Sequence, residues 1–223
     1  MDILEKFYSK IKGAYFAFLT LLAVGFGIFV ALFIYLPVDP SFSIFSNYIS
    51  DLGAGPIGSR IIFSIGMILG AVFLIFLILY ISVYLKVKEE KYQLIFGYQA
   101  SGIIAGLGLI LIGIFPLDRA NFSDFFMHVI GAVIFFSFIT ISNLYLGYIE
   151  YKNSEFSKII GILSFICGIL SAIFIGGFLI QESDLIEPQT FVYLSEWTFL
   201  LFITIWLIIH GLYFWRKNIS ENK

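Results

Sequence analysis

The sequence predicts an all-α membrane protein, a polytopic bundle of six transmembrane helices with a short interfacial helix between the first two. Two observations support this prediction. Of the 223 residues, 60% are hydrophobic and 13% are charged, whereas a typical soluble domain has about 25% charged residues. The hydrophobic residues also form long runs that short polar breaks separate. Strands of a transmembrane barrel would instead alternate apolar and polar residues.

Six apolar runs are long enough to cross a bilayer, because a helix needs about 20 residues to span ~30 Å of hydrocarbon. They cover residues 13–36, 59–85, 93–115, 125–149, 157–181 and 190–215. No linker divides the chain, so residues 1–223 are interpreted as a single transmembrane domain. The first run is too long for the apolar part of a cleavable signal, and we expect it to be retained as a span.

The basic residues predict how the chain is oriented. Numbered alternately from the N-terminus, one side of the membrane receives 11 of the 13 Lys and Arg residues, and the other receives only Arg60 and Arg119. Basic residues in short loops favour the cytoplasm, so both termini should be cytoplasmic in a multi-pass protein of the cell membrane. The outer side collects eight acidic residues: Asp39, Asp51, Asp118, Asp124, Glu182, Asp184, Glu187 and Glu196. Scattered bases in short loops argue against a nucleic-acid partner.

Small residues recur at the spacing that packs helices in lipid. Gly66 and Gly70 form a G-x-x-x-G motif in the second span, and Gly102 and Gly106 form another in the third. Such motifs allow close backbone approach. We expect them to pack helices within one chain, although they would also permit a homo-oligomer. The single Cys167 lies inside the fifth span, where a small core residue is the simplest interpretation.

The longest outer connection, residues 37–58, is the most polar part of the chain near a span. Residues 41–53 are predicted to form a short amphipathic helix at the interface, with Ser43, Asn47 and Ser50 on one edge. Its apolar face would lie against lipid or neighbouring helices. Gly53 would end this helix and Pro56 would begin the next one. A simple connector would have this geometry too, but it would not need Ser46, Asn47, Ser50 and Asp51 together.

The stretch SNYISDLGAGP at residues 46–56 resembles the signature of the domain-of-unknown-function 998 family, six-span membrane proteins of archaea and bacteria. That family pattern continues with an acidic residue after a G-x-F-P turn, a histidine opening the fourth span and an acidic residue opening the sixth. Here GIFPLD supplies Asp118, then His128 follows, and SEW supplies Glu196. A more distant similarity, I-S-D-x-G followed by Pro, is to the damage-regulated autophagy modulator and GPI-anchor lipid-remodelling membrane proteins. The first family implies no established activity, and the second implies a connection to lipid.

The matched residues are all predicted to lie near the outer boundary of the membrane. The candidate ligand-binding residues are Ser46, Asn47, Ser50, Asp51, Asp118, His128 and Glu196. Ionisable groups near a membrane usually face the bundle interior and pair, so we expect Asp51, His128 and Glu196 to converge, in contact with Asn47 or Ser50. If the protein is an enzyme, these three are also the catalytic candidates, as acid–base groups.

The sequence favours no cofactor and no metal. A catalytic zinc usually takes three protein ligands, often histidines. The chain has two histidines, and His210 lies ~21 Å from Glu196 along one helix. A mixed Asp, Glu and His site, or calcium on the acidic face, stays open, as does a Ser–His–Asp arrangement of Ser50 and His128 with Asp51 or Asp124. We expect His210 to be a core histidine bonded to a neighbouring carbonyl or hydroxyl.

Two classes of function therefore remain. The favoured one is a binding protein that holds a lipid headgroup or a membrane partner at the outer leaflet, with membrane lipids as its partners. The alternative is a membrane-embedded enzyme that acts on lipid-linked substrates at the same interface. A proton-coupled transporter ranks third, because it would need ionisable groups near the bilayer midplane, and the middles of the predicted spans contain none.

Overall fold

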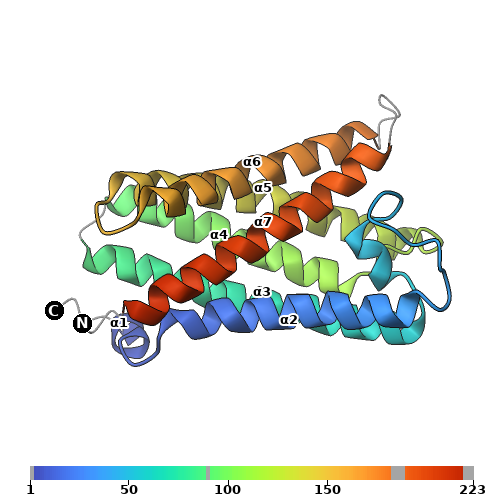
Figure 1. Cartoon of the computed structure of the whole chain (residues 1–223), viewed down its shortest axis with the longest axis horizontal. Helices are drawn as coiled ribbons and strands as arrows, with labels where there is room; N and C mark the ends of the chain where they lie inside the picture. Colours follow the sequence, from blue (N-terminus) through green and yellow to red (C-terminus); the bar gives the residue numbers. More distant parts are fainter. Residues whose placement is uncertain (1–2, 89–90, 182–188, 218–223) are drawn as a thin grey trace.

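The computed structural model describes residues 3–88, 91–181 and 189–217, and these form a helical bundle (Figure 1). The long helices are α2 (Gly13–Tyr35), α3 (Ile57–Val87), α4 (Tyr92–Ile114), α5 (Phe122–Lys152), α6 (Lys158–Gln181) and α7 (Gln189–Arg216). All six are long and apolar enough to cross a membrane, which confirms the six predicted spans. Glu182, Asp184, Glu187 and Lys223, together with nearly all of the outer connection 182–189, lie outside the described residues.

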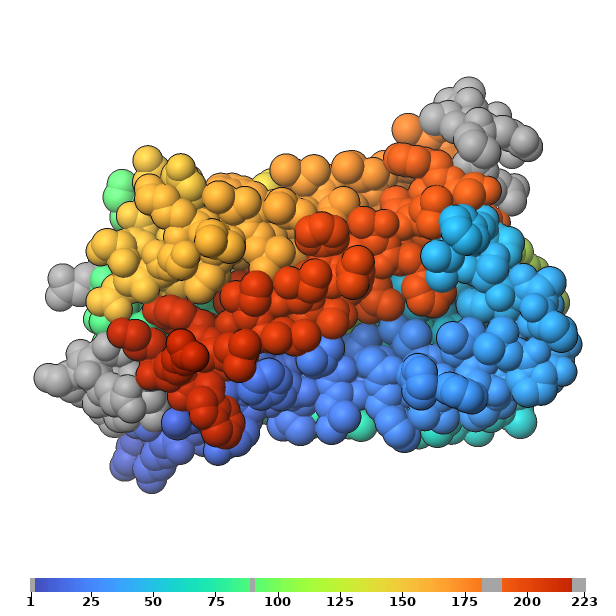
Figure 2. All heavy atoms as spheres, in the orientation of Figure 1, coloured from blue at the N-terminus to red at the C-terminus, as the bar shows by residue number. Residues whose placement is uncertain are grey.

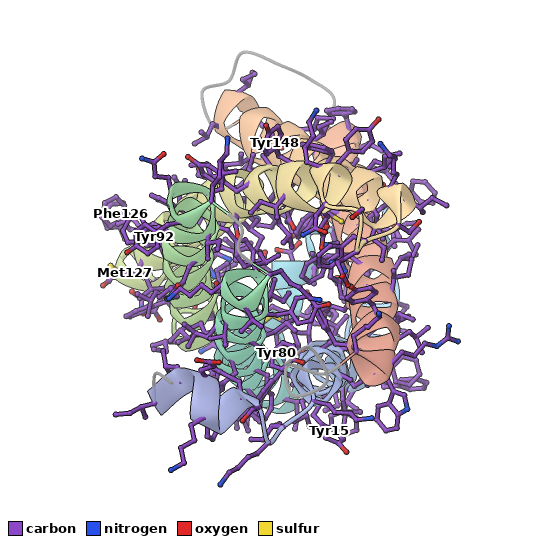
Figure 3. The ribbon with its side chains drawn as sticks, turned by 90° about the vertical axis from the view of Figure 1, so that its left-hand side faces the viewer. Tyr15, Tyr80, Tyr92, Phe126, Met127 and Tyr148 are labelled. Atoms are coloured by element: carbon purple, nitrogen blue, oxygen red, sulfur yellow. The ribbon has the colours of Figure 1, made fainter. Side chains whose placement is uncertain are left out.

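Each long helix packs against the next in sequence, and α7 returns to pack against α2. In Figure 1, α7 crosses the bundle obliquely: it lies close to α2 where α7 ends and diverges from α2 toward the opposite end. Figure 3, an end-on view, shows the helices around a shared interior, with Tyr80 inside and Tyr92 and Phe126 pointing away. Tyr80 is fully buried, whereas Tyr92 and Phe126 are exposed. Large apolar side chains thus cover both the interior and the surface that would face lipid.

Glycines allow the closest helix contacts. A Cβ built on Gly66 would lie 2.7 Å from the Cα of Gly27, so α2 and α3 touch backbone to backbone. A Cβ on Gly70 would collide with Val24 of α2, and one on Gly106 would collide with Ile75 of α3. Both G-x-x-x-G motifs therefore contribute to packing inside the chain.

Two short elements differ from prediction. Helix α1 (Ile3–Tyr8), which was not predicted, precedes the first span. The amphipathic helix predicted over 41–53 is wrong in extent: residues 41–48 form turns, and only the 3₁₀ helix η1 (Ile49–Gly53) is regular. The cause is local hydrogen bonding, because Asn47 Oδ1 accepts the backbone N–H of Ser43 and Ser43 Oγ accepts that of Phe45. Such side-chain bonds compete with those of a helix.

Segment 37–56, which connects α2 to α3, folds over one end of the bundle between the diverging ends of α2 and α7 (Figure 1). Within this segment, Tyr48, Ile49 and Leu52 are buried. Two hydrogen bonds hold it in place: Tyr48 Oη donates to Gln181 Oε1 at 2.8 Å, and Trp197 Nε1 donates to the carbonyl of Asn47 at 3.0 Å. The most polar stretch of the chain thus becomes a cover over the bundle interior.

Candidate functional site

A cavity of about 370 Å³ lies inside the bundle, beneath segment 37–56. All six long helices contribute to its walls, which are mainly Leu, Ile and Phe side chains. Its ionisable residues are His128 and Glu196, and Ser50 lies with them at the end that segment 37–56 covers. We call these three residues the polar end of the cavity. An apolar pocket with a few polar groups in one place is the usual form of a small-molecule site.

Glu196 belongs to the second turn of α7, where its side chain is buried. Its Oε2 atom accepts the backbone N–H of Ile49 at 2.7 Å. No other hydrogen bond of this carboxyl group is present among the described residues, so Oε1 is free to bond to a ligand. The same side chain thus anchors segment 37–56 and presents an oxygen to the cavity end.

His128 lies in α5 and is 3% exposed. Its Nδ1 atom is 2.7 Å from the carbonyl of Phe115, the residue that ends α4. A carbonyl only accepts, so Nδ1 carries the proton of this bond. In the neutral ring Nε2 is then a free acceptor, and it has no hydrogen-bond partner within the part of the chain that the structure describes. The α4 carbonyl thereby fixes both the ring orientation and its tautomer.

Asp51 lies on the other side of segment 37–56 and is not part of the cavity wall. Its Oδ2 atom accepts the N–H of Tyr48 at 2.9 Å and contacts Asn47 Nδ2 at 3.4 Å. The two carboxylates Asp51 and Glu196 therefore take the consecutive backbone N–H groups of Tyr48 and Ile49. Burial raises the pKa of Asp51 above its usual value, although the Tyr48 N–H, the charge of Arg119 and the Asn47 amide oppose this shift.

The predicted site residues thus fall into three groups. Ser50, His128 and Glu196 meet at the cavity, while Asn47 and Asp51 stabilise the segment above it. Ser46 is exposed and bonds to Ser43 and Asn47. Asp118 pairs with Arg60 at 3.3 Å on a solvent-accessible surface. No hydrogen bond joins Asp51 to His128 among the described residues, and Nδ1 of His128 bonds to the Phe115 carbonyl.

Replacing Asp51 with asparagine is expected to preserve the fold, because the amide oxygen can still accept the Tyr48 N–H. Because the pKa of Asp51 is raised in the folded protein, the fold favours the protonated side chain. The stability that this side chain contributes is complete below its unfolded pKa of about 3.9. It is lost as pH rises through the folded pKa. Asparagine does not ionise, so the Asp51→Asn variant does not lose this stability as pH rises. Its melting temperature in detergent, relative to wild type, should therefore be higher at neutral pH than at acidic pH. The opposite trend would mean that the fold favours the charged carboxylate.

A second polar cluster, which sequence reasoning missed, lies toward the other end of the bundle. His210 Nε2 is 2.7 Å from Glu150 Oε1, and neither side chain is exposed. Ser164 Oγ donates to Glu150 Oε2 at 2.6 Å and accepts the N–H of the Trp206 indole at 2.8 Å. His210 Nδ1 also bonds to the Trp206 carbonyl, as expected for a core histidine. We call Glu150, Ser164, Trp206 and His210 the buried network.

The buried network has a sequence signal, although a weak one. The predicted fourth span ended at residue 149, which left Glu150 outside it, whereas α5 continues to Lys152. Asn143, Leu146 and Glu150 then share one helix face, since they follow at steps of three and four residues. All three are buried. Among the described residues, no group of three or more His, Cys, Asp or Glu side chains is placed to hold a metal ion.

Comparison with known proteins gives one match. A family model described as "Protein of unknown function (DUF998)" matches residues 23–213. This range includes Ser50, His128 and Glu196, the buried network, and at least part of every long helix. No curated protein and no solved structure matches the chain. The predicted similarity to the autophagy-modulator and lipid-remodelling proteins stays a prediction.

Proposed function

The chain belongs to the DUF998 family of unknown function, and from its cavity we propose that it binds an amphiphilic membrane lipid. The apolar chain of the ligand occupies the cavity, and its polar group contacts Ser50, His128 and Glu196. One observation carries the proposal: an apolar interior space has its ionisable residues gathered at one end. Such a space matches a molecule with one long apolar part and one polar end.

The cavity has a lateral route to lipid. Gly25 and Phe29 of α2 line it, and both are exposed on the surface of the bundle. Leu200, Ile203 and Thr204 of α7 line the facing wall and are half-buried. Figure 2 shows α7 crossing this face above α2, with segment 37–56 between their diverging ends. A lipid can therefore enter between α2 and α7 from the bilayer without crossing water.

The lysine and arginine bias supports a location of this cavity in the outer half of the cell membrane. The start of α2 and the end of α7 lie together at the end opposite segment 37–56 (Figure 1). The same end carries the basic loops, which favours a cytoplasmic location for it and for both termini. Segment 37–56 then lies at the outer leaflet.

Cysteine labelling tests this orientation. Ser123 lies in the first turn of α5, Ser154 lies in the loop between α5 and α6, and both are exposed. Cys167 is fully buried, so replacing it with alanine gives a background without cysteine. In intact cells, a membrane-impermeant maleimide should label Ser123→Cys, and it should label Ser154→Cys only after lysis. Labelling of Ser154→Cys in intact cells would show that the protein has the opposite orientation.

The second candidate function is an enzyme that acts on a lipid-linked substrate at the same place. The observation that favours it is the pairing of an oriented imidazole, whose Nε2 is a free acceptor, with a buried carboxylate at one cavity end. These are the groups that acid–base catalysis uses. Turnover of a bound lipid during incubation with purified protein would favour this candidate over binding alone.

Photolabelling tests the proposed function. A single-chain lipid with a diazirine in its chain, added to membranes that contain the protein, should label peptides of α2 and α7 at cavity positions such as Ile28 and Ile203. Excess unlabelled lipid should abolish this labelling. A matched reference is the shallow groove between α2 and α3 formed by Leu22, Phe26 and Leu69, which faces outward. Labelling confined to that groove would mean that the protein only contacts bulk lipid.

A further inference from the structure

We infer that the polar end of the ligand is a hydrogen-bond donor without negative charge, a hydroxyl or an amine, on a single long chain. This inference deepens the proposed function and rests on it. It excludes ligands whose polar end is a phosphate or a carboxylate. The reasons are the atoms that the cavity presents, the charges around it and its size.

Each of the two ionisable side chains at the cavity end has one atom without a hydrogen-bond partner in the described chain. The Nδ1–H of His128 donates to the Phe115 carbonyl. In the neutral ring, Nε2 therefore carries a lone pair that can accept a hydrogen bond. Oε2 of Glu196 accepts the Ile49 N–H, and Oε1 has no partner in the described chain, so it accepts a hydrogen bond when the carboxyl group is ionised. Ser50 can donate or accept, so it suits either kind of ligand. A ligand donor would satisfy these buried acceptors, which are costly to leave unpaired.

The charges around the cavity also disfavour an anion. No Lys or Arg is among the described residues that line it, and Glu196 is its one acidic residue. The basic residues near this end of the bundle interact with other acidic residues. Arg60 pairs with Asp118, and the charge of Arg119 favours the charged form of Asp51 in segment 37–56. A phosphate or carboxylate inside would therefore be buried without a compensating cation, which is strongly unfavourable.

The size of the cavity favours one chain. A volume of about 370 Å³ lies near the lower limit of ligand pockets, which run from about 300 to 1,000 Å³. Phe135, Phe136 and Phe199 narrow the space from α5 and α7. One alkyl or isoprenoid chain fills such a space, whereas a second chain would have to remain in the bilayer between α2 and α7.

A set of long-chain probes with one chain length and four polar ends tests the inference. The ends are a hydroxyl, a primary amine, a carboxylate and a phosphate monoester. Each competes with the photolabel for wild-type protein in nanodiscs of zwitterionic lipid. We expect the alcohol and the amine to compete about tenfold or more better than the two anions, the discrimination that a lost hydrogen bond to a charged group gives.

One variant separates the two donor classes. Glu196→Gln keeps an oxygen for the Ile49 N–H and cannot supply the negative charge that would pair with a protonated amine. If the natural ligand is an amine, this variant should bind the amine probe about tenfold or more weakly; if it is an alcohol, the alcohol probe should retain most of its affinity. Ser195→Ala is the matched control, because the Ser195 hydroxyl bonds only to the Val192 carbonyl of its own helix. Melting temperatures of both variants verify that they fold.

The possible failures can be distinguished. Equal competition by all four probes, or stronger competition by the phosphate or the carboxylate, would overturn the donor inference and leave lipid binding intact. Failure of every probe to compete, with no labelling of cavity peptides, would overturn both the inference and the proposed function.

Discussion

Replacing Glu150 with alanine is expected to lower the free energy of unfolding of the bundle by about 3–5 kcal/mol, the usual cost of removing one partner from a buried ion pair. The carboxylate joins three helices, because it lies in α5, contacts His210 of α7 at 2.7 Å and accepts from Ser164 of α6 at 2.6 Å. All three side chains are fully buried. The alanine variant would leave the His210 Nε2 without its partner and the Ser164 hydroxyl without the acceptor of its proton, both without access to water.

A surface pair provides the matched control for this prediction. Glu155 contacts Lys88 at 3.1 Å near the same end of the bundle, but its side chain is 37% exposed. Glu155→Ala should therefore change stability by only about 0–1 kcal/mol. The measurement is thermal unfolding in detergent of both variants and of Glu150→Ala/His210→Phe. The double variant should lose less than the sum of its single changes, since the partners act as a pair. Equal effects of Glu150→Ala and Glu155→Ala would show that the buried network is not a structural joint.

The membrane spans were predictable because their signal is long and redundant. About 20 apolar residues in succession have few alternatives to a spanning helix, and every predicted span corresponds to a helix. The boundaries differ most for α5, which begins at Phe122 rather than 125. The Asn121 side chain accepts the N–H groups of Ser123 and Asp124 and thereby caps the helix before the apolar run starts. A cap of this type depends on single residues, so hydropathy alone does not reveal it.

The structure between the spans was less predictable, because helix-favouring spacing competes there with side-chain hydrogen bonds. Residues 41–53 have the periodicity of an amphipathic helix, yet Ser43 and Asn47 divert backbone N–H groups and produce turns. Glu150 was missed for another reason. An acidic residue near the end of a span is usually solvated, and only the tertiary arrangement places His210 and Ser164 around it.

The candidate site was predicted in part. His128 and Glu196 were selected for their depth in the membrane and for the family-like motifs, and both line the cavity with Ser50. The common depth of the candidate residues did not determine which way Ser46 and Asp118 would face, and these two residues do not line the cavity. The cavity itself has no sequence signal, because an apolar residue beside a void looks the same as one in a packed core.

If the cavity holds an amphiphile, as proposed, a bulky side chain at its opening should prevent binding. Two glycines allow this to be tested. A Cβ added at Gly25 or at Gly176 meets no heavy atom within 4 Å, so a side chain can begin in open space at either position. Only Gly25 lines the cavity; Gly176 lies on α6 away from it. Both lie inside helices, where replacing glycine raises helix propensity. Gly25→Phe and Gly176→Phe should therefore both fold, while only the first places a ring at the cavity opening.

The most direct measurement is native mass spectrometry of wild-type protein and of these two variants, all extracted from the same membranes, to quantify the bound amphiphile. We predict that a single-chain amphiphile remains bound to wild type and to Gly176→Phe. In Gly25→Phe its occupancy should fall about tenfold or more, which corresponds to a loss of at least about 1.4 kcal/mol of binding free energy. Equal retention of the amphiphile by Gly25→Phe and Gly176→Phe, or its absence from wild type, would contradict the account.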